Sequence, residues 1–285
     1  MARNRESYEY TLNFPKFILF GDSITERSFN QYPIQDFIAD GFDKFVDSES
    51  KLKEIKDNLN TPEFSFGAGL SFSYVRRLDV VNRGFSGYNS GHMKAMIDKL
   101  LYLDHDSQPE GSKCVMATLF LGTNDAATAK PDMIEYDEYV ENMKYIIEKI
   151  TDKGIKLIII GPAHHAAHLW EPLNQDEVLD LNLTRSNERN LQYSNGLEKL
   201  CKSLNLPFVN LYEKFDNYKS NHKDLNSDDL FLDGIHLNGR GQKIVYDSIV
   251  ESIKQNYPDL HFQNEKLKMR LPDWNKITIE DIEKL

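Results

Sequence analysis

The chain contains very little cysteine. Cys114 and Cys201 are the only two cysteines among its 285 residues, and their spacing matches no metal-binding cysteine set. Cys114 opens an apolar run and Cys201 lies in a helical pattern, so we interpret both as small core residues. A disulfide between them is the less favoured alternative. These counts exclude a disulfide-rich scaffold.

Positive charge is in the minority. The sequence holds 34 Lys and Arg against 45 Asp and Glu, which gives a formal net charge of -11 at pH 7. Nucleic acids and anionic membrane surfaces both repel a net anion. We therefore expect neither of them as a main partner.

Long hydrophobic runs are missing too. The apolar run Leu157–Ile160 is far too short to cross a bilayer. The segment Met1–Lys16 is polar and charged, without the uninterrupted apolar stretch of a signal peptide. We expect no stable membrane insertion, and the expected location is the cytoplasm.

Short apolar runs rich in β-branched residues alternate with longer amphipathic segments. Continuous apolar strands are typical of a sheet that helices cover on both faces, and strand–helix–strand repetition implies right-handed crossovers between parallel strands. The predicted strands are Lys16–Phe20, Leu78–Asn82, Cys114–Leu121, Lys156–Ile160 and Pro207–Leu211, and the predicted helices are Gly91–Leu103, Tyr136–Asp152, Arg185–Leu204 and Gly241–Asn256. The sequence therefore predicts an α/β protein.

The length of the chain fits one α/β domain over residues 1–285. Residues 36–63 interrupt the alternation with many acidic residues and scattered apolar positions, which predicts a charged helical insertion. This insertion is either a solvent-facing excursion or a lid over the site. Residues 258–285 form a C-terminal tail in which Trp274 suggests docking, on the same domain or on a second subunit.

A serine follows the first predicted strand directly, in the segment Phe20–Thr25. Ligands of open parallel sheets bind at the carboxyl ends of the strands, and Ser23 is expected there with backbone N–H groups that favour negative charge. Gly-Asp-Ser is equally typical of a loop with a helix N-cap. Alone, this segment does not distinguish a nucleophile from a cap.

A potential base lies near the end of the chain. A serine hydroxyl needs a positioned base to become a nucleophile, and Asp233-Gly234-Ile235-His236 supplies an imidazole with a carboxylate three residues away. Ser23, Asp233 and His236 together satisfy the Ser-His-Asp logic in the chain order Ser, Asp, His. The alternative is a surface turn followed by a capped helix.

Donors for an oxyanion follow two further strands. Gly84, after the second strand, offers an unobstructed backbone N–H, and Asn124, after the third, offers a side-chain amide. With the N–H of Ser23 they make three candidate donors, and one such donor is typically worth about 2.7–4 kcal/mol in the transition state. Gly-Thr-Asn-Asp is also a common turn with a helix cap.

Taken together, the four blocks resemble the GDSL/SGNH hydrolase family in order and spacing. The resemblance implies a flavodoxin-like three-layer α/β/α fold with a five-stranded parallel sheet in the order 2-1-3-4-5. It also implies ester hydrolysis through an acyl-enzyme, with Ser23, Asp233 and His236 as catalytic residues. Ser23, Gly84 and Asn124 would form the oxyanion hole.

One branch of the family is more similar, the fungal isoamyl acetate-hydrolysing esterases. The similar segments are Phe17–Glu26, Arg83–Tyr88, Met116–Asp125, Ile158–Pro162, Asp233–Leu237 and Leu271–Trp274. This resemblance implies hydrolysis of acetate esters of medium-sized alcohols, with a small-molecule ester as partner and neither cofactor nor metal. It also implies a homodimer with a C-terminal segment near the site.

Other functions remain open at this point. The same machinery serves a thioesterase, a carbohydrate acetylesterase, a lysophospholipase or an acyltransferase. A non-catalytic flavodoxin-like module could hold a phosphate or flavin at Gly21–Thr25, although it gives Asp233 and His236 no role. His164, His165 and His168 either line the rim of the substrate pocket or, less favoured, bind a metal.

Overall fold

A single parallel sheet organises the part of the chain that the computed structural model describes, residues 10–30, 64–222 and 227–285. Its five strands lie in the order β2-β1-β3-β4-β5, as predicted. The strands are Lys16–Gly21 (β1), Asp79–Gly84 (β2), Cys114–Phe120 (β3), Lys156–Ile160 (β4) and Phe208–Val209 (β5). The predicted insertion at 36–63 falls outside the described residues.

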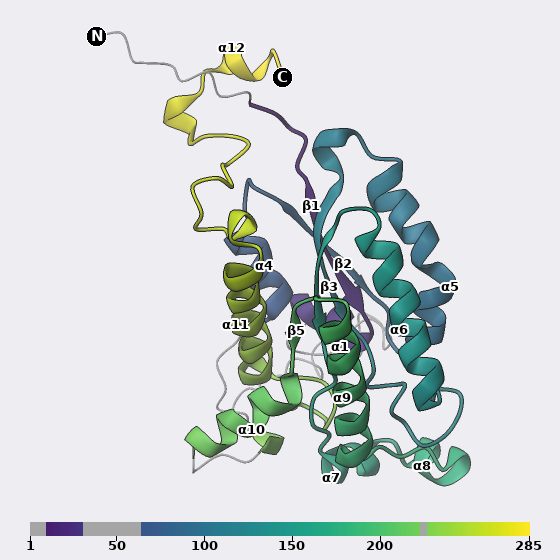
Figure 1. The fold of residues 1–285 in the computed structure, drawn as a ribbon. Coiled ribbons are helices and arrows are strands. Elements are labelled where there is room, and N and C mark those ends of the chain that lie inside the picture. The colour runs from purple at the N-terminus through teal and green to yellow at the C-terminus, as the bar shows by residue number, and fades with distance from the viewer. Residues whose placement is uncertain (1–9, 31–63, 223–226) are drawn as a thin grey trace, which may run out of the picture.

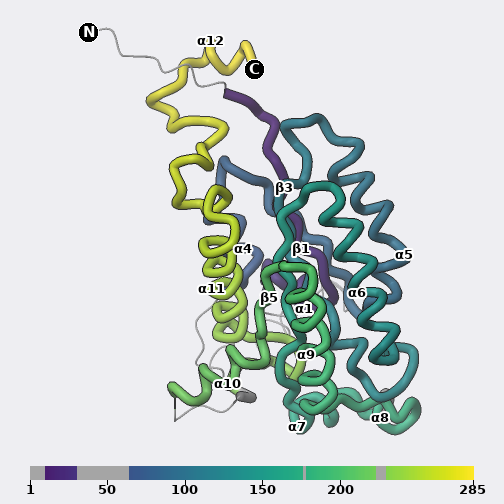
Figure 2. The backbone as a smooth tube through the Cα atoms, in the orientation of Figure 1, coloured from purple at the N-terminus to yellow at the C-terminus, as the bar shows by residue number. Residues whose placement is uncertain are grey.

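Helices cover both faces of this sheet (Figures 1 and 2). One face carries α5 (Ser90–Leu101), α6 (Tyr136–Thr151) and α9 (Asn187–Ser203), and the other carries α4 (Phe66–Ser73), α10 (Leu211–Asn221) and α11 (Gly239–Asn256). The predicted three-layer α/β/α architecture is confirmed. None of the helices in the described ranges is long and apolar enough to cross a membrane.

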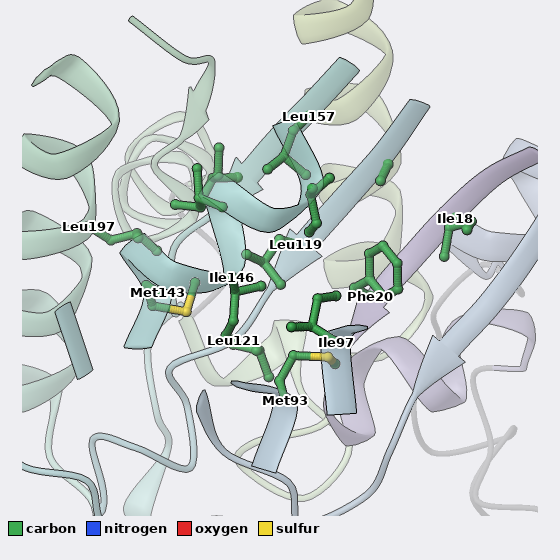
Figure 3. Packing of buried hydrophobic residues seen from close by; sticks show 14 of the residues in the cluster. Ile18, Phe20, Met93, Ile97, Leu119, Leu121, Met143, Ile146, Leu157 and Leu197 are labelled. Atoms are coloured by element: carbon green, nitrogen blue, oxygen red, sulfur yellow. The ribbon is translucent and has the colours of Figure 1, made fainter. Parts of the chain in front are cut away.

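The two cores follow from the alternation of side chains along β1. Ile18 and Phe20 belong to the core on the α5 side, and Phe17 and Leu19 to the core on the α11 side. All four side chains are fully buried. Figure 3 shows Ile18 and Phe20 in the first core, with residues from α5, α6 and α9. Each such burial contributes roughly 1.5–3 kcal/mol, which explains why the strand is apolar throughout.

The amphipathic pattern of α6 is also reproduced. The apolar residues on one side of this helix are completely buried, and they are Tyr139, Met143, Ile146, Ile147 and Ile150. Tyr139 also donates its hydroxyl proton to the carbonyl of Leu121, just beyond the end of β3, at 3.1 Å. The helix therefore fixes the position of the loop that follows β3.

The register places the ends of the central strands at one level. Gly21 at the end of β1 pairs with Gly84 at the end of β2 and with Phe120 at the end of β3. The segments that leave these strands therefore emerge side by side. Ser23, Gly84 and Asn124 lie at or just beyond these strand ends, whereas Asp233 and His236 come from a loop after β5.

Some boundaries differ from prediction. β5 is shorter than the predicted Pro207–Leu211 because Asn210 caps α10, accepting the N–H of Glu213 with its side chain. Among the described residues, six α-helices were not predicted: α1 (Ser23–Glu26), α4, α7 (Ala167–Trp170), α8 (Gln175–Leu181), α10 and α12 (Ile279–Ile282). Both cysteines are buried and free, so the disulfide alternative was wrong.

The C-terminal segment continues beyond the end of α11 toward the end of the molecule where α12 lies (Figure 1). The N–H of Arg270 donates to the carbonyl of Arg76, and the N–H of Thr11 donates to the carbonyl of Arg270. Arg76 also donates to the carbonyl of Pro272 and pairs with Asp273 at 2.9 Å. Thr11 and Arg76 precede β1 and β2, so the tail contacts the amino-terminal edge of the sheet.

Candidate active site

Ser23 is the first residue of α1 and is separated from the end of β1 by Asp22 alone. Asp22 is the N-cap of this helix and accepts the N–H of Ile24 at 2.9 Å, which fixes the turn that presents the serine. The N–H of a first helical residue has no acceptor inside its own helix. Ser23 therefore offers both a hydroxyl group and a backbone donor at this turn.

His236 and Asp233 meet Ser23 across the molecule. His236 Nε2 lies 2.8 Å from Ser23 Oγ, and His236 Nδ1 lies 2.6 Å from Asp233 Oδ2. A carboxylate only accepts hydrogen bonds, so Nδ1 carries the proton and Nε2 is left to accept the proton of the serine hydroxyl. The structure thus brings together the three side chains that the sequence singled out.

The loop of Asp233 explains the three-residue spacing to His236. Asp233 Oδ1 accepts the N–H groups of Ile235 and His236 at 3.0 and 2.8 Å, while Oδ2 accepts the imidazole. Burial acts to raise the pKa of Asp233, but the hydrogen bond and charge of His236 and the two N–H donors outweigh it. The pKa therefore lies below its ordinary value, and the carboxyl stays ionised.

Two residues after β4 hold the same loop from behind. The carbonyl of Gly234 accepts the N–H of Ala166 at 2.9 Å and the Nδ1 of His165 at 3.0 Å. Burial, helped by the positive charge of Arg185, lowers the pKa of His165 to about 4, so this imidazole is neutral near pH 7. His165 therefore supports the loop as a neutral donor, a role that the sequence did not indicate.

Asn124 occupies the loop after β3 and is nearly fully buried. Its Nδ2 donates to the carbonyl of Tyr88 at 2.9 Å, and its Oδ1 accepts from Nη2 of Arg185 at 3.3 Å. An amide nitrogen carries two protons, so Nδ2 has a second one to offer. This geometry suits a donor to a substrate oxygen.

Gly84 lies differently from what was expected of an oxyanion donor. Its N–H already donates to Asn82 Oδ1 at 2.8 Å. A Cβ at this position would lie 2.0 Å from the backbone nitrogen of Glu26, so the glycine allows β2 to pack against α1. This close approach to α1 is a packing reason for a glycine at position 84.

Gly87, three residues later in the same block, has the properties that were expected of Gly84. Its φ is +75°, a conformation that favours glycine, and a Cβ there would meet no atom within 4 Å. Within the described residues its N–H has no hydrogen-bond partner. It adjoins Tyr88, whose carbonyl binds Asn124. Both glycines stand in one short motif, and they differ in backbone conformation and in the space around them.

Two carboxyl groups are buried beside the serine. Asp22 and Asp125 are almost inaccessible, and Asp125 accepts the N–H of Ser90 at 2.9 Å. Burial raises the pKa of Asp22 to about 7, and the negative charge of Asp125 adds to the rise. The hydrogen bond from the Ile24 N–H acts in the opposite direction but is outweighed. Burial likewise raises the pKa of Asp125 to about 6. These acids support the loops after β1 and β3.

The histidines after β4 do not converge on one point. His164 stacks on Tyr212 and pairs with Asp216 at 3.1 Å, while His165 faces Gly234. Among the described residues, no group of three His, Cys, Asp or Glu side chains is arranged to hold a metal. The geometry gives the metal-binding alternative no support.

Three side chains beside the site were missed from the sequence. Arg27 approaches Asp233 Oδ2 at 3.9 Å, the ring of Trp170 lies 6.2 Å from that of His236, and the Arg185 guanidinium lies over Trp170 at 5.1 Å. None of them stands in a spacing that predicts chemistry. Only the packing of α7 and of the segment before α9 brings Trp170 and Arg185 to the site.

Sequence comparisons relate this chain to known proteins. A family model for the GDSL-like lipase/acylhydrolase family matches residues 19–244. An isoamyl acetate-hydrolyzing esterase of Saccharomyces cerevisiae is 32% identical over 93% of this chain and 96% of its own length. A human isoamyl acetate-hydrolyzing esterase 1 homolog is 24% identical over 93% of this chain and 89% of its own.

Solved structures resemble the fold at low sequence identity. An acetylxylan esterase from Geobacillus stearothermophilus aligns with a TM-score of 0.55 at 16% identity, over 85% of this chain and 94% of that one. At this identity the likeness shows the fold alone. The match of the family model over most of the chain and the yeast relative show more: the chain belongs to the GDSL-like lipase/acylhydrolase family and is a serine ester hydrolase.

Proposed function

We propose that this hydrolase cleaves short-chain esters, typically acetates of medium-sized alcohols, through an acyl-enzyme on Ser23. The observation that carries the proposal is the chain of contacts from Ser23 Oγ to His236 Nε2 at 2.8 Å and from His236 Nδ1 to Asp233 Oδ2 at 2.6 Å. A serine held this way can lose its proton as it attacks. The yeast relative named for isoamyl acetate supports the substrate class.

Acylation begins when Ser23 Oγ attacks the ester carbonyl carbon and His236 Nε2 takes the hydroxyl proton. Asp233 is ionised because the contacts that orient the ring also hold the pKa of its carboxyl low. Its negative charge stabilises the imidazolium. The tetrahedral intermediate then expels the alkoxide, which takes the proton from His236 and leaves as the alcohol. Water deacylates the serine by the reverse sequence, with His236 as the base.

The negative charge on the carbonyl oxygen needs donors that are already in place. We assign the N–H of Ser23, the second Nδ2 proton of Asn124 and the N–H of Gly87 to this role. Gly87 replaces Gly84 in the proposal because the N–H of Gly84 is engaged with Asn82. Each donor is worth about 2.7–4 kcal/mol in the transition state.

Two experiments test the chemistry. A fluorophosphonate probe should label the wild-type chain and fail to label Ser23→Ala. Turnover of acyl esters from C2 to C12, together with release of isoamyl alcohol from isoamyl acetate, should be fastest at the short acyl end. Labelling of Ser23→Ala would contradict the nucleophile, and an optimum at long acyl chains, or faster turnover of thioesters or acetylated sugars, would contradict the substrate class.

The role of Asn124 has its own prediction. Asn124→Ala should lower kcat about 100- to 1000-fold and leave KM within a few-fold, because the donor acts on charge that develops only in the transition state. Steady-state kinetics on a short acyl ester measures this. A rise in KM with kcat unchanged would contradict the oxyanion role.

The homodimer and the cytoplasmic location stay predictions.

A further inference from the structure

Arg185 is a buried cation that the proposed mechanism does not use. Its side chain is 3% exposed and pairs with Asp132 Oδ2 at 2.8 Å. A charge removed from water costs several kcal/mol unless ion pairs and hydrogen bonds compensate it. Such a residue at the edge of a reaction site needs an explanation beyond the stability of the fold.

The second contact of the same nitrogen points to one. Arg185 Nη2 also donates to Asn124 Oδ1 at 3.3 Å. The two ends of an amide have nearly the same shape, but arginine can only donate hydrogen bonds. Oδ1 must therefore face Arg185, which turns Nδ2 toward the carbonyl of Tyr88, 2.9 Å away. With one Nδ2 proton on Tyr88, the other points to a fixed place.

The guanidinium is itself held in place. Asp132 accepts from it on one side, and the ring of Trp170 lies 5.1 Å from its centre. The backbone carbonyl of Asp132 accepts from Asn89 Nδ2 at 2.9 Å, which ties this pair to the start of α5. Asp132 and Trp170 thus hold the guanidinium, which in turn donates to Asn124.

We propose that Arg185 is a positioning residue that acts through Asn124. It keeps the amide oriented with Nδ2 toward the substrate oxygen, and its charge on Oδ1 polarises the amide so that Nδ2 donates more strongly as the oxyanion forms. This inference rests on the proposed function, in which Asn124 is an oxyanion donor. Charges buried at a preorganised site act with less screening than in water.

A double-mutant cycle tests the inference. Arg185→Met, which keeps an apolar stem and removes the donors, should lower kcat about 10- to 100-fold with KM nearly unchanged, since a misplaced catalytic group costs up to about 100-fold. In an Asn124→Ala background the same substitution should change kcat less than about two-fold, because its target is gone. Arg185→Lys should recover part of the loss by keeping the charge.

Arg189→Met is the matched control. Arg189 lies in the first turn of α9. It donates to the carbonyl of Ala126 at 2.9 Å, and its guanidinium lies over the ring of Tyr193. The kcat of Arg189→Met should stay within about two-fold of wild type. Circular dichroism and melting curves check the fold of every variant. If Arg185→Met does not fold, the Lys variant in both backgrounds gives the same cycle.

The outcomes separate the two proposals. Additive losses in the cycle, or a loss that appears in KM instead of kcat, overturn the role of Arg185. A full-activity Arg185→Met beside an impaired Asn124→Ala overturns this inference and leaves the proposed function standing. A full-activity Asn124→Ala overturns the oxyanion assignment itself, and the inference falls with it.

Discussion

At the scale of single residues, Asp22 has an unusual position for an acid. One carboxylate oxygen caps α1, and the other, Oδ2, is buried with no hydrogen-bond partner within the described residues. The folded chain therefore favours the protonated form, and the pKa rises to about 7. In the unfolded chain an Asp titrates near its ordinary value of about 3.9.

This difference in pKa predicts how Asp22 makes stability depend on pH. Between about pH 4 and pH 7 the folded state binds more protons than the unfolded state, so the contribution of Asp22 to the free energy of unfolding falls as pH rises. Above pH 7 the contribution is flat. Asp22→Asn keeps an oxygen acceptor for Ile24 and removes the charge, so it should be more stable than wild type at pH 8 and gain much less at pH 4.5.

Urea denaturation of both proteins at the two pH values measures the effect. The expected gain at pH 8 is on the order of 1–4 kcal/mol, since one unit of pKa shift corresponds to 1.36 kcal/mol. Comparing the variant with wild type at each pH removes the contribution of His165, which both proteins share, and leaves that of Asp22 together with its coupling to Asp125. Parallel pH curves for the two proteins would contradict the buried charge.

The two glycines of the block after β2 give a second residue-scale prediction. Gly84→Ala should unfold or strongly destabilise the protein, because its Cβ would lie 2.0 Å from the backbone of Glu26. Gly87→Ala should fold with a loss of about 1 kcal/mol from its positive φ, yet lower kcat as the loop shifts its N–H. Melting curves and kinetics separate them. A folded Gly84→Ala with impaired kcat would restore Gly84 as the donor.

At the scale of elements, the sequence predicted what depends on strong local patterns. The strands are continuous apolar runs, and Ser23, Asn124, Asp233 and His236 were found because their residue types fit the chemistry at strand ends or in a capped loop. α4 was missed because Phe66–Ser73 contains two glycines, which are poor helix formers, so its packing on α11 decides its structure. Arg185 was missed because its role depends on contacts between distant segments.

The loop after β4 provides the element-scale prediction, on adjacent histidines. His165→Ala should lower kcat about ten-fold, because it removes the donor that holds the carbonyl of Gly234 between Asp233 and His236. His164→Ala should leave kcat nearly unchanged, since His164 contacts Tyr212 and Asp216 instead. The pKa of His165 is about 4, so its effect should be the same from pH 6 to pH 8.

Kinetics of the two variants across that pH range tests the argument. A loss in His165→Ala that grows or disappears with pH would mean that the residue acts by its charge and not as a neutral donor. Equal losses in the two variants would mean that the whole loop, and not the bond to Gly234, determines the activity.

At the scale of the whole molecule, the C-terminal tail lies far from the chain's own candidate site. The tail contacts Thr11 and Arg76 at the amino-terminal edge of the sheet, whereas Ser23 stands at the carboxyl ends of the strands. Figure 1 likewise shows α12 and α7 at opposite ends of the molecule. A C-terminal segment near the site, as the family resemblance implied, would therefore have to come from another copy.

The exposed apolar side chains of the tail make this arrangement testable. Trp274 is 88% exposed and Ile279 is 76% exposed. If they dock on a second copy, the wild-type chain should sediment at twice its 33.0 kDa at tens of micromolar, and Trp274→Ser with Ile279→Ser should sediment at 33.0 kDa. Leu179→Ser, which changes a 77% exposed leucine on α8, should keep the wild-type mass. A wild-type chain that sediments at 33.0 kDa would contradict the dimer. The ion pair between Arg76 and Asp273 would then only fix the tail on its own chain.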